Sequence, residues 1–207
     1  RRWEEAEFGA LRCHDLRRPK LELRNRGVVP SSVNEFDIGL LGAGAIGSQC
    51  GDLLAKAGVA SVMIWDNGVL DAGNAIRHTL GVGHTGYPKA GLVAGSMILH
   101  NPHCMVTSRG ESVLTVMWDE ESDIWKRQVL LSTIAEDATE LAFNSRASQM
   151  GASVYYLRAL RRGEVGRLIR VDGEGDACLE CVGRFHRDDD GRAIVVHPTG
   201  DEVVARE

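Results

Sequence analysis

A glycine motif between a short apolar segment and a helix-like segment restricts the fold of this chain more than any other feature. The motif is Gly-x-Gly-x-x-Gly, formed by Gly42, Gly44 and Gly47, and Asp66 follows nineteen residues after the last glycine. In a strand–turn–helix unit these glycines allow a tight turn, a close approach of the backbone to a phosphate, and packing of the helix on the strand. Free N–H groups at the helix start attract anions, and the distal acid can accept hydrogen bonds from ribose hydroxyls. The motif therefore predicts a nucleotide-binding βαβ unit, with a tight turn that has no ligand as the alternative.

Strand-like and helix-like segments alternate after this motif. Short apolar segments between turn residues predict strands, and longer segments with apolar residues at helical spacing predict helices. This alternation predicts a doubly wound, mostly parallel α/β sheet of Rossmann-like type, with helices on both faces and an additional region of late strands. The predicted strands are 37–41, 61–66, 103–108, 128–132, 153–160 and 167–171, and the predicted helices are 45–57, 88–100 and 136–150.

Length and composition indicate one folded domain. With 207 residues, 43% of them hydrophobic and 26% charged, the chain is typical of a single globular domain. Residues 1–32 are rich in arginine and have little apolar periodicity, so we interpret them as an N-terminal extension or linker. Residues 33–207 form the expected domain. Because the chain begins without methionine and ends within a pattern, we expect it to be a piece of a longer polypeptide, truncated at the C-terminus.

Charge and cysteine usage argue against several classes of protein. The formal net charge of −5 gives no basic face for nucleic acid. No apolar run has the length of a membrane span and no secretory leader is recognisable, so neither a membrane location nor export is expected. The five cysteines, an odd number at irregular spacing, do not resemble a disulfide framework. A reducing, cytoplasmic location is the expectation that follows.

The segment that follows Asp66 separates two classes of nucleotide-binding protein. An NAD-dependent dehydrogenase would explain the glycine motif equally well, but its chain usually continues through a helix to the third strand. Here residues 67–78 are polar and interrupted by glycine, and a Gly-Tyr-Pro-Lys segment later ends at Lys89. Lys89 lies in the first turn of a predicted helix, where the helix dipole disfavours a cation by about 0.3–1 kcal/mol. A bound anion would offset that cost; a solvated ammonium group that bends away is the alternative.

An ordered series of short motifs extends from about residue 37 to residue 181. The series consists of Gly42-x-Gly44-x-x-Gly47-Ser48, Asp66, Asn74-x-x-Arg77, Arg77-His78-x-Leu80-Gly81, Gly86-x-Pro88-Lys89, Asn101-Pro102 and Ala177-Cys178-Leu179-Glu180-Cys181. Each motif alone is a weak signal, whereas the whole series in this order is specific. It resembles the family of ThiF, MoeB and ubiquitin-activating-enzyme-like adenylyltransferases, in particular the bacterial members.

The resemblance implies an enzyme that uses ATP to activate a carboxyl group, usually the C-terminal carboxylate of a small ubiquitin-like protein or a peptide. The carboxylate attacks the α-phosphate, pyrophosphate leaves and an acyl-adenylate forms. Such chemistry needs positioning and charge neutralisation rather than a nucleophile of the protein. The resemblance also implies a homodimer, and some members are fused to a ubiquitin-conjugating-like domain. A non-catalytic scaffold or interaction domain with the same fold is the alternative function, and an NAD-dependent oxidoreductase is the third.

The same resemblance assigns roles to individual residues. The glycine loop would hold the phosphates of ATP, and Asp66 would hold the ribose. Arg77 and Lys89 match the phosphate-contacting cations of the family and would neutralise charge on the departing pyrophosphate. Asn74 matches the asparagine that positions the phosphates. A surface ion pair for Arg77 and a helix cap for Asn74 are the alternatives.

The expected magnesium site departs from the family pattern. ATP is bound with Mg²⁺, which prefers carboxylate oxygens, but Ser132 and Ala135 occupy the two places at which the family has acidic residues. We expect Asp137 to be the metal ligand instead. Thr133-x-x-Glu136 has the spacing of a capping box, which would engage the Glu136 carboxylate with a backbone N–H.

Cys178 and Cys181 form half of a structural zinc site, because such a site takes four ligands. His186 and His197 could complete it, but their spacings are not diagnostic, and we favour two free thiols over a zinc site.

The cysteines give no support for a thioester step. Some relatives pass the acyl group to a cysteine beyond the Cys-x-x-Cys motif, and here no cysteine follows Cys181. Cys50 and Cys104 lie in a predicted helix and a predicted strand. We expect both to be small buried side chains rather than reactive thiolates.

Overall fold

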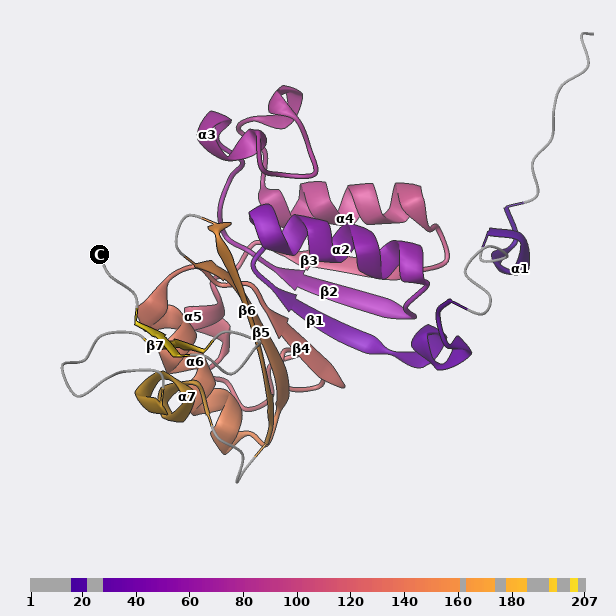
Figure 1. Ribbon diagram of the computed structural model, residues 1–207. Coiled ribbons are helices and arrows are strands. Elements are labelled where there is room, and N and C mark those ends of the chain that lie inside the picture. The colour runs from indigo at the N-terminus through magenta and orange to yellow at the C-terminus, as the bar shows by residue number, and fades with distance from the viewer. Residues whose placement is uncertain are drawn as a thin grey trace, which may run out of the picture.

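A six-stranded sheet forms the centre of the computed structural model, which describes residues 16–21, 28–160, 163–173, 178–185, 194–196 and 202–204 (Figure 1). The strand order is β3-β2-β1-β4-β5-β6, and the chain therefore reverses direction across the sheet between β1 and β4. All neighbours are parallel except β5 and β6, which are antiparallel. The strands are β1 (Asp37–Leu41), β2 (Ser61–Trp65), β3 (Met105–Arg109), β4 (Val129–Ser132), β5 (Ser153–Leu160) and β6 (Val165–Asp172). The predicted doubly wound α/β sheet is thus confirmed.

Helices cover both faces of this sheet (Figure 1). On one face lie α2 (Ala45–Ala57) and α4 (Lys89–His100), and on the other lie α5 (Val113–Val116) and α6 (Asp137–Gln149). The remaining described elements are α1 (Arg18–Leu21), η2 (Ser31–Glu35), α3 (Ala72–Ala75), η3 (Val82–His84), α7 (Leu179–Phe185) and the antiparallel pair β7 (Ile194–Val196) and β8 (Glu202–Val204). None of the helices in the described ranges is long and apolar enough to cross a bilayer.

Two apolar clusters hold the layers together, one on each face of the sheet. Leu40 and Ile64 point towards α2 and α4, whereas their neighbours Leu41 and Trp65 point towards α5 and α6. All four side chains are buried. Because these strands are buried on both faces, they read as continuous apolar runs instead of alternating ones.

Part of the predicted N-terminal extension contacts the domain. The Arg18 guanidinium donates a hydrogen bond to the Gly58 carbonyl oxygen at 2.9 Å, and His103 Nε2 lies 2.7 Å from the Leu16 carbonyl oxygen. The 3₁₀ helix η2 crosses the predicted boundary at residue 33. The division into an extension and a domain stays a prediction, since residues 1–15 and 22–27 lie outside the described ranges.

The turn between β1 and α2 depends on two of the motif glycines. Gly42 has φ of +92°, a conformation that L side chains rarely adopt. A Cβ atom at Gly47 would overlap the Gly42 carbonyl oxygen and lie 2.7 Å from Thr133 Oγ1. The first turn of α2 therefore packs directly against the end of β1, as the motif predicts.

We predict that Gly47→Ala destabilises the fold by at least about 2 kcal/mol, because the new methyl group meets backbone that cannot move aside. Gly44→Ala is the matched control: a Cβ atom there meets nothing within 4 Å, so we expect a loss below about 1 kcal/mol. Urea unfolding of both variants measures the two free energies. Equal losses would show that the close approach at Gly47 does not limit stability.

Candidate functional site

A cavity of about 510 Å³ opens where the parallel strands end. Its walls come from the segments that follow β1, β2, β3 and β4. In open α/β sheets, ligands bind at this carboxyl edge, next to the point where the strand order reverses. The lining residues are Gly42, Gly44, Trp65, Asp66, Asn67, Lys89, Glu111, Ser112, Val113, Leu114, Thr133, Ile134, Ala135, Glu136 and Thr139.

The Asp66 carboxylate joins three parts of the cavity wall. Its Oδ2 accepts a hydrogen bond from the Ala43 N–H at 2.7 Å, and its Oδ1 accepts one from the Gly68 N–H at 2.7 Å. Lys89 Nζ lies 3.3 Å from Oδ1. Because a carboxylate offers about four lone-pair sites, Asp66 retains capacity for a further donor. The structure therefore brings together Asp66, Lys89 and the glycine loop, all of which the sequence assigned to one site.

The glycine loop presents backbone to this cavity. Gly44 is the N-cap residue of α2, and no side chain caps the N–H groups of its first turn. Those groups have no partner within the helix. Since nothing lies within 4 Å of a Cβ position at Gly44, the loop is open on the side of the cavity. An anion placed there would meet N–H groups and the positive end of the helix dipole.

Two further residues fix the glycine loop, and the sequence interpretation missed their role. Thr133 Oγ1 lies 3.0 Å from the Leu41 carbonyl oxygen and 2.9 Å from that of Gly42, so its hydroxyl ties the loop after β4 to the turn after β1. His78 is buried; its Nδ1 accepts from the Leu80 N–H, and its Nε2 lies 2.9 Å from the Ala43 carbonyl oxygen. This pattern requires a proton on Nε2. In the sequence, the Arg77-His78 motif was the only signal for this role of His78.

Asn74 and Arg77 contact each other and do not line the cavity. The Arg77 guanidinium donates to Asn74 Oδ1 at 3.0 Å, and the Asn74 amide donates to Asp71 Oδ2 at 2.6 Å. Asp71 is the N-cap residue of α3 and accepts from the Asn74 N–H, so the capping role considered for Asn74 is wrong. Since neither side chain lines the cavity, their expected contact with phosphate stays a prediction.

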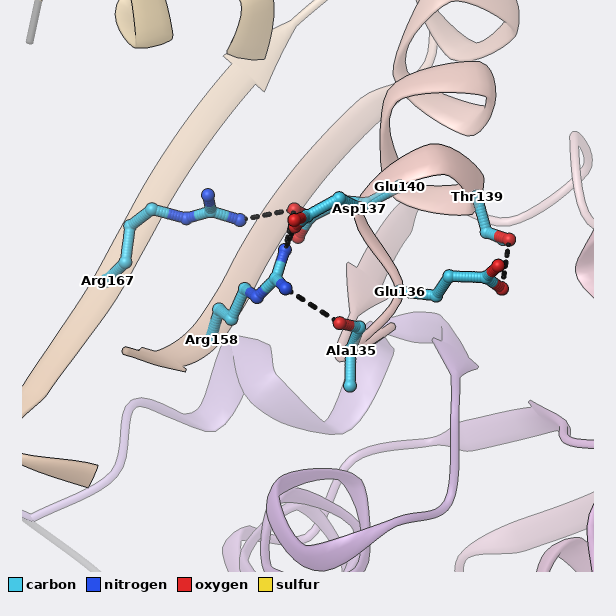
Figure 2. Close-up of polar contacts among 7 residues, drawn as sticks. All are labelled: Ala135, Glu136, Asp137, Thr139, Glu140, Arg158 and Arg167. Atoms are coloured by element: carbon cyan, nitrogen blue, oxygen red, sulfur yellow. Dashed lines mark hydrogen bonds and ion pairs between the residues drawn. The ribbon is translucent and has the colours of Figure 1, made fainter. Parts of the chain in front are cut away.

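The structure places Glu136, and not Asp137, at the cavity. Figure 2 shows the two neighbouring side chains pointing in different directions: Asp137 towards Arg158, and Glu136 towards Thr139. The Asp137 side chain is 78% exposed and does not line the cavity, whereas Glu136 does. The role of Asp137 as a metal ligand stays a prediction, and its side chain lies outside the cavity.

The capping-box prediction is also wrong. Helix α6 begins at Asp137, with Glu136 itself as the N-cap residue and without a side-chain cap hydrogen bond. Thr133 therefore lies outside the helix and bonds to the turn after β1 instead. The Glu136 carboxylate accepts a hydrogen bond from the Thr139 hydroxyl at 2.8 Å.

The cysteine pair lies apart from this cavity. Cys178 Sγ and Cys181 Sγ are 3.6 Å apart, and a hydrogen bond from the Cys181 backbone lowers the pKa of the Cys178 thiol. Within the described ranges, no three His, Cys, Asp or Glu side chains are grouped so as to hold a metal ion. His186 and His197, the candidates for completing a zinc site, lie outside those ranges.

Of the other two described cysteines, Cys104 is buried, as expected, whereas Cys50 is only half-buried. Burial raises the pKa of Cys104 to about 11 and also raises the pKa of Cys50. Both groups are therefore neutral thiols at pH 7, which disfavours a nucleophilic role.

Comparison with known proteins agrees with this fold. Crystal structures of E. coli MccB superimpose on 72% of this chain and 42–45% of the MccB chain, at 15% identity. The structure of MccB with succinimide gives a TM-score of 0.63, and those with ATP and with MccA-N7isoASN each give 0.62. At this level of identity the likeness concerns the fold. The chain spans less than half the length of these neighbours.

Sequence comparison gives the family. A stretch of 69 residues is 35% identical to the ATP-dependent ubiquitin transferase-like protein Cap2 of Enterobacter hormaechei subsp. hoffmannii (strain UCI 50), and it represents 33% of this chain and 12% of Cap2. Residues 30–200 match the model of the ThiF family. Since that match extends over most of the chain, this protein belongs to the ThiF family.

Proposed function

We propose that this protein binds ATP in the cavity at the carboxyl edge of the sheet and adenylates the C-terminal carboxylate of a small ubiquitin-like protein or a peptide. The proposal rests on the convergence of an open glycine loop, the Asp66 carboxylate and the Lys89 ammonium group on one wall of that cavity. Backbone N–H groups and a largely buried side-chain cation are groups that hold polyphosphates in proteins.

The relatives support the nature of the two substrates. MccB has been crystallised with ATP and, separately, with MccA-N7isoASN. Cap2 is described as an ATP-dependent ubiquitin transferase-like protein. ATP is therefore the proposed nucleotide, and a ubiquitin-like protein or peptide is the proposed acyl partner. We also propose that the protein acts as a homodimer in the cytoplasm, with a ubiquitin-conjugating-like domain as a further partner.

The reaction would use the residues of the cavity for binding and charge stabilisation. The acyl carboxylate attacks the α-phosphorus, and the bond from the α-phosphorus to the departing pyrophosphate breaks. Lys89 would neutralise the charge that grows on pyrophosphate, in a site where water is partly excluded. In the free protein Lys89 is paired with Asp66, and its side chain is 18% exposed. ATP would therefore compete with the Asp66 carboxylate for the Lys89 ammonium group.

Asp66 would bind the ribose with its remaining lone pairs while it holds Ala43 and Gly68 in place. Arg77 and Asn74 are proposed to reach the phosphates after residues 72–77 approach the cavity. Their mutual hydrogen bond at 3.0 Å would move with them as a unit.

The carboxylates at the cavity fit a magnesium ion that arrives with ATP. Mg²⁺ in nucleotide sites is held by one or two carboxylates together with phosphate oxygens. Glu136 and Glu111 both line the cavity, and Glu136 lies beside the loop that carries Thr133. We propose Glu136 as the ligand in place of Asp137. The ion would neutralise phosphate charge, while Glu136 would orient it.

A structural zinc at Cys178 and Cys181 is a separate proposal. Their Sγ separation of 3.6 Å suits two ligands of one tetrahedral ion, which needs two further ligands.

A non-catalytic scaffold is the second candidate function. Ser132 and Ala135 stand where the family has acidic residues, and the buried Ser132 side chain cannot supply a carboxylate. Family membership disfavours the third alternative, an NAD-dependent oxidoreductase.

We predict that the protein exchanges labelled pyrophosphate into ATP in the presence of its carboxylate partner, and that Lys89→Ala lowers this exchange about 100-fold because a cation next to the departing group is lost. Lys56→Ala is the matched control, since Lys56 is exposed on α2 and pairs with Asp52. Thermal unfolding should show both variants folded. Exchange at the wild-type rate in Lys89→Ala contradicts its role, and no exchange in any form favours the scaffold.

We predict that Glu136→Gln raises the Mg²⁺ concentration needed for half-maximal exchange more than Asp137→Asn does. The reason is that, of these two carboxylates, Glu136 lines the cavity and Asp137 does not. Magnesium titrations at saturating ATP measure both values against wild type. The opposite order would restore Asp137 as the ligand and would require the first turn of α6 to rearrange.

A further inference from the structure

The Arg158 guanidinium holds the loop between β4 and α6 at several points. From its place on β5, it donates to the Ala135 carbonyl oxygen at 2.7 Å through Nη2. Its Nη1 forms ion pairs with Asp137 and, at 3.2 Å, with Glu140 Oε2 (Figure 2). These contacts span the end of the loop and the first turn of α6. The fork of an arginine can reach several acceptors at once, which the single ammonium group of a lysine cannot do as well.

The loop held by Arg158 is also a wall of the cavity. Its residues 134–136 line the cavity, as does Thr139 one turn further on. Glu136 lies between Ala135 and Asp137, both of which Arg158 contacts. With the residue on each side fixed, the Glu136 side chain is directed away from Arg158 and towards Thr139 (Figure 2). It also lines the cavity.

A buried carboxylate anchors this arrangement to the sheet. The Glu140 side chain is 3% exposed and pairs with both Arg158 and Arg167, the latter at 2.5 Å. A carboxylate buried to this degree is stable as an anion only with such partners. Arg167 pairs with Glu140, and in the described part of the chain it forms no hydrogen bond or ion pair with residues 134–137. Arg158 and Arg167 therefore share Glu140, and only Arg158 also holds the loop.

We infer that Arg158 is a positioning residue for the magnesium–ATP complex: it orients Glu136 by holding the Ala135 carbonyl group and the Asp137 carboxylate on either side of it. The inference rests on the proposed function and adds to it a residue on β5 that does not line the cavity. It concerns the metal affinity of the ATP complex.

The test compares Arg158→Met with Arg167→Met. Each variant removes one of the two cations on Glu140, and urea unfolding measures the stability that each variant loses. ATP binding is then measured by calorimetry across a range of Mg²⁺ concentrations, and Mn²⁺ binding to the ATP complex by electron paramagnetic resonance. We predict that Arg158→Met raises the half-saturating metal concentration at least about fivefold, a coupling of about 1 kcal/mol. Arg167→Met should change it less than about twofold.

Two further variants separate positioning from a merely structural role. Arg158→Lys keeps a cation beside Glu140 and should keep the fold, while it still raises the half-saturating metal concentration. In a double-mutant cycle, Arg158→Met should add little to Glu136→Gln, because both act on the same metal contact.

The outcomes are distinguishable. Equal shifts in Arg158→Met and Arg167→Met, additive effects with Glu136→Gln, or a wild-type value in Arg158→Lys each overturn the inference and leave ATP binding intact. A wild-type protein that binds no ATP at any metal concentration overturns the proposed function, and the inference with it.

Discussion

The carboxyl edge of the sheet depends on the interactions of one group, the Asp66 carboxylate. It accepts hydrogen bonds from N–H groups in the turn after β1 and in the loop after β2, and it forms an ion pair with the first residue of α4. One side chain thus fixes three chain segments that are separated in sequence. Removing it would leave the Ala43 and Gly68 N–H groups without their acceptor, at a cost of about 1–3 kcal/mol for each that is buried. The group that we propose to bind the ribose therefore also fixes the local fold.

The parts of this architecture that follow from local pattern could be predicted from the sequence. The alternation of elements predicts a mostly parallel sheet, and the spacing of Gly42 and Gly47 predicts a tight turn. The structure confirms both. Lys89 was predicted to lie in the first turn of a helix, and it begins α4. The cavity wall at residues 111–114 was missed, because α5 has only four residues and gives almost no periodic signal.

The parts that depend on distant contacts could not be predicted. Glu136 and Asp137 are adjacent and chemically similar, and their directions are set by Arg158, twenty-one residues beyond Asp137. In the same way, the role of Thr133 depends on carbonyl groups ninety-one and ninety-two residues earlier. A local rule such as the capping box considers only the residues next to a helix start. It fails here because distant carbonyl groups engage Thr133, and the Thr139 hydroxyl engages Glu136.

The two edge strands of the sheet have a consequence for handling the protein. Strand β3 is largely exposed and ends at Arg109, and β6 carries Arg167 and Arg170. Charged side chains along an open edge discourage hydrogen bonding to the strand of a neighbouring molecule. Concentrated solutions should therefore resist fibril-like association through these strands, and replacing the exposed Arg109 and Arg170 with valine or isoleucine would remove that protection.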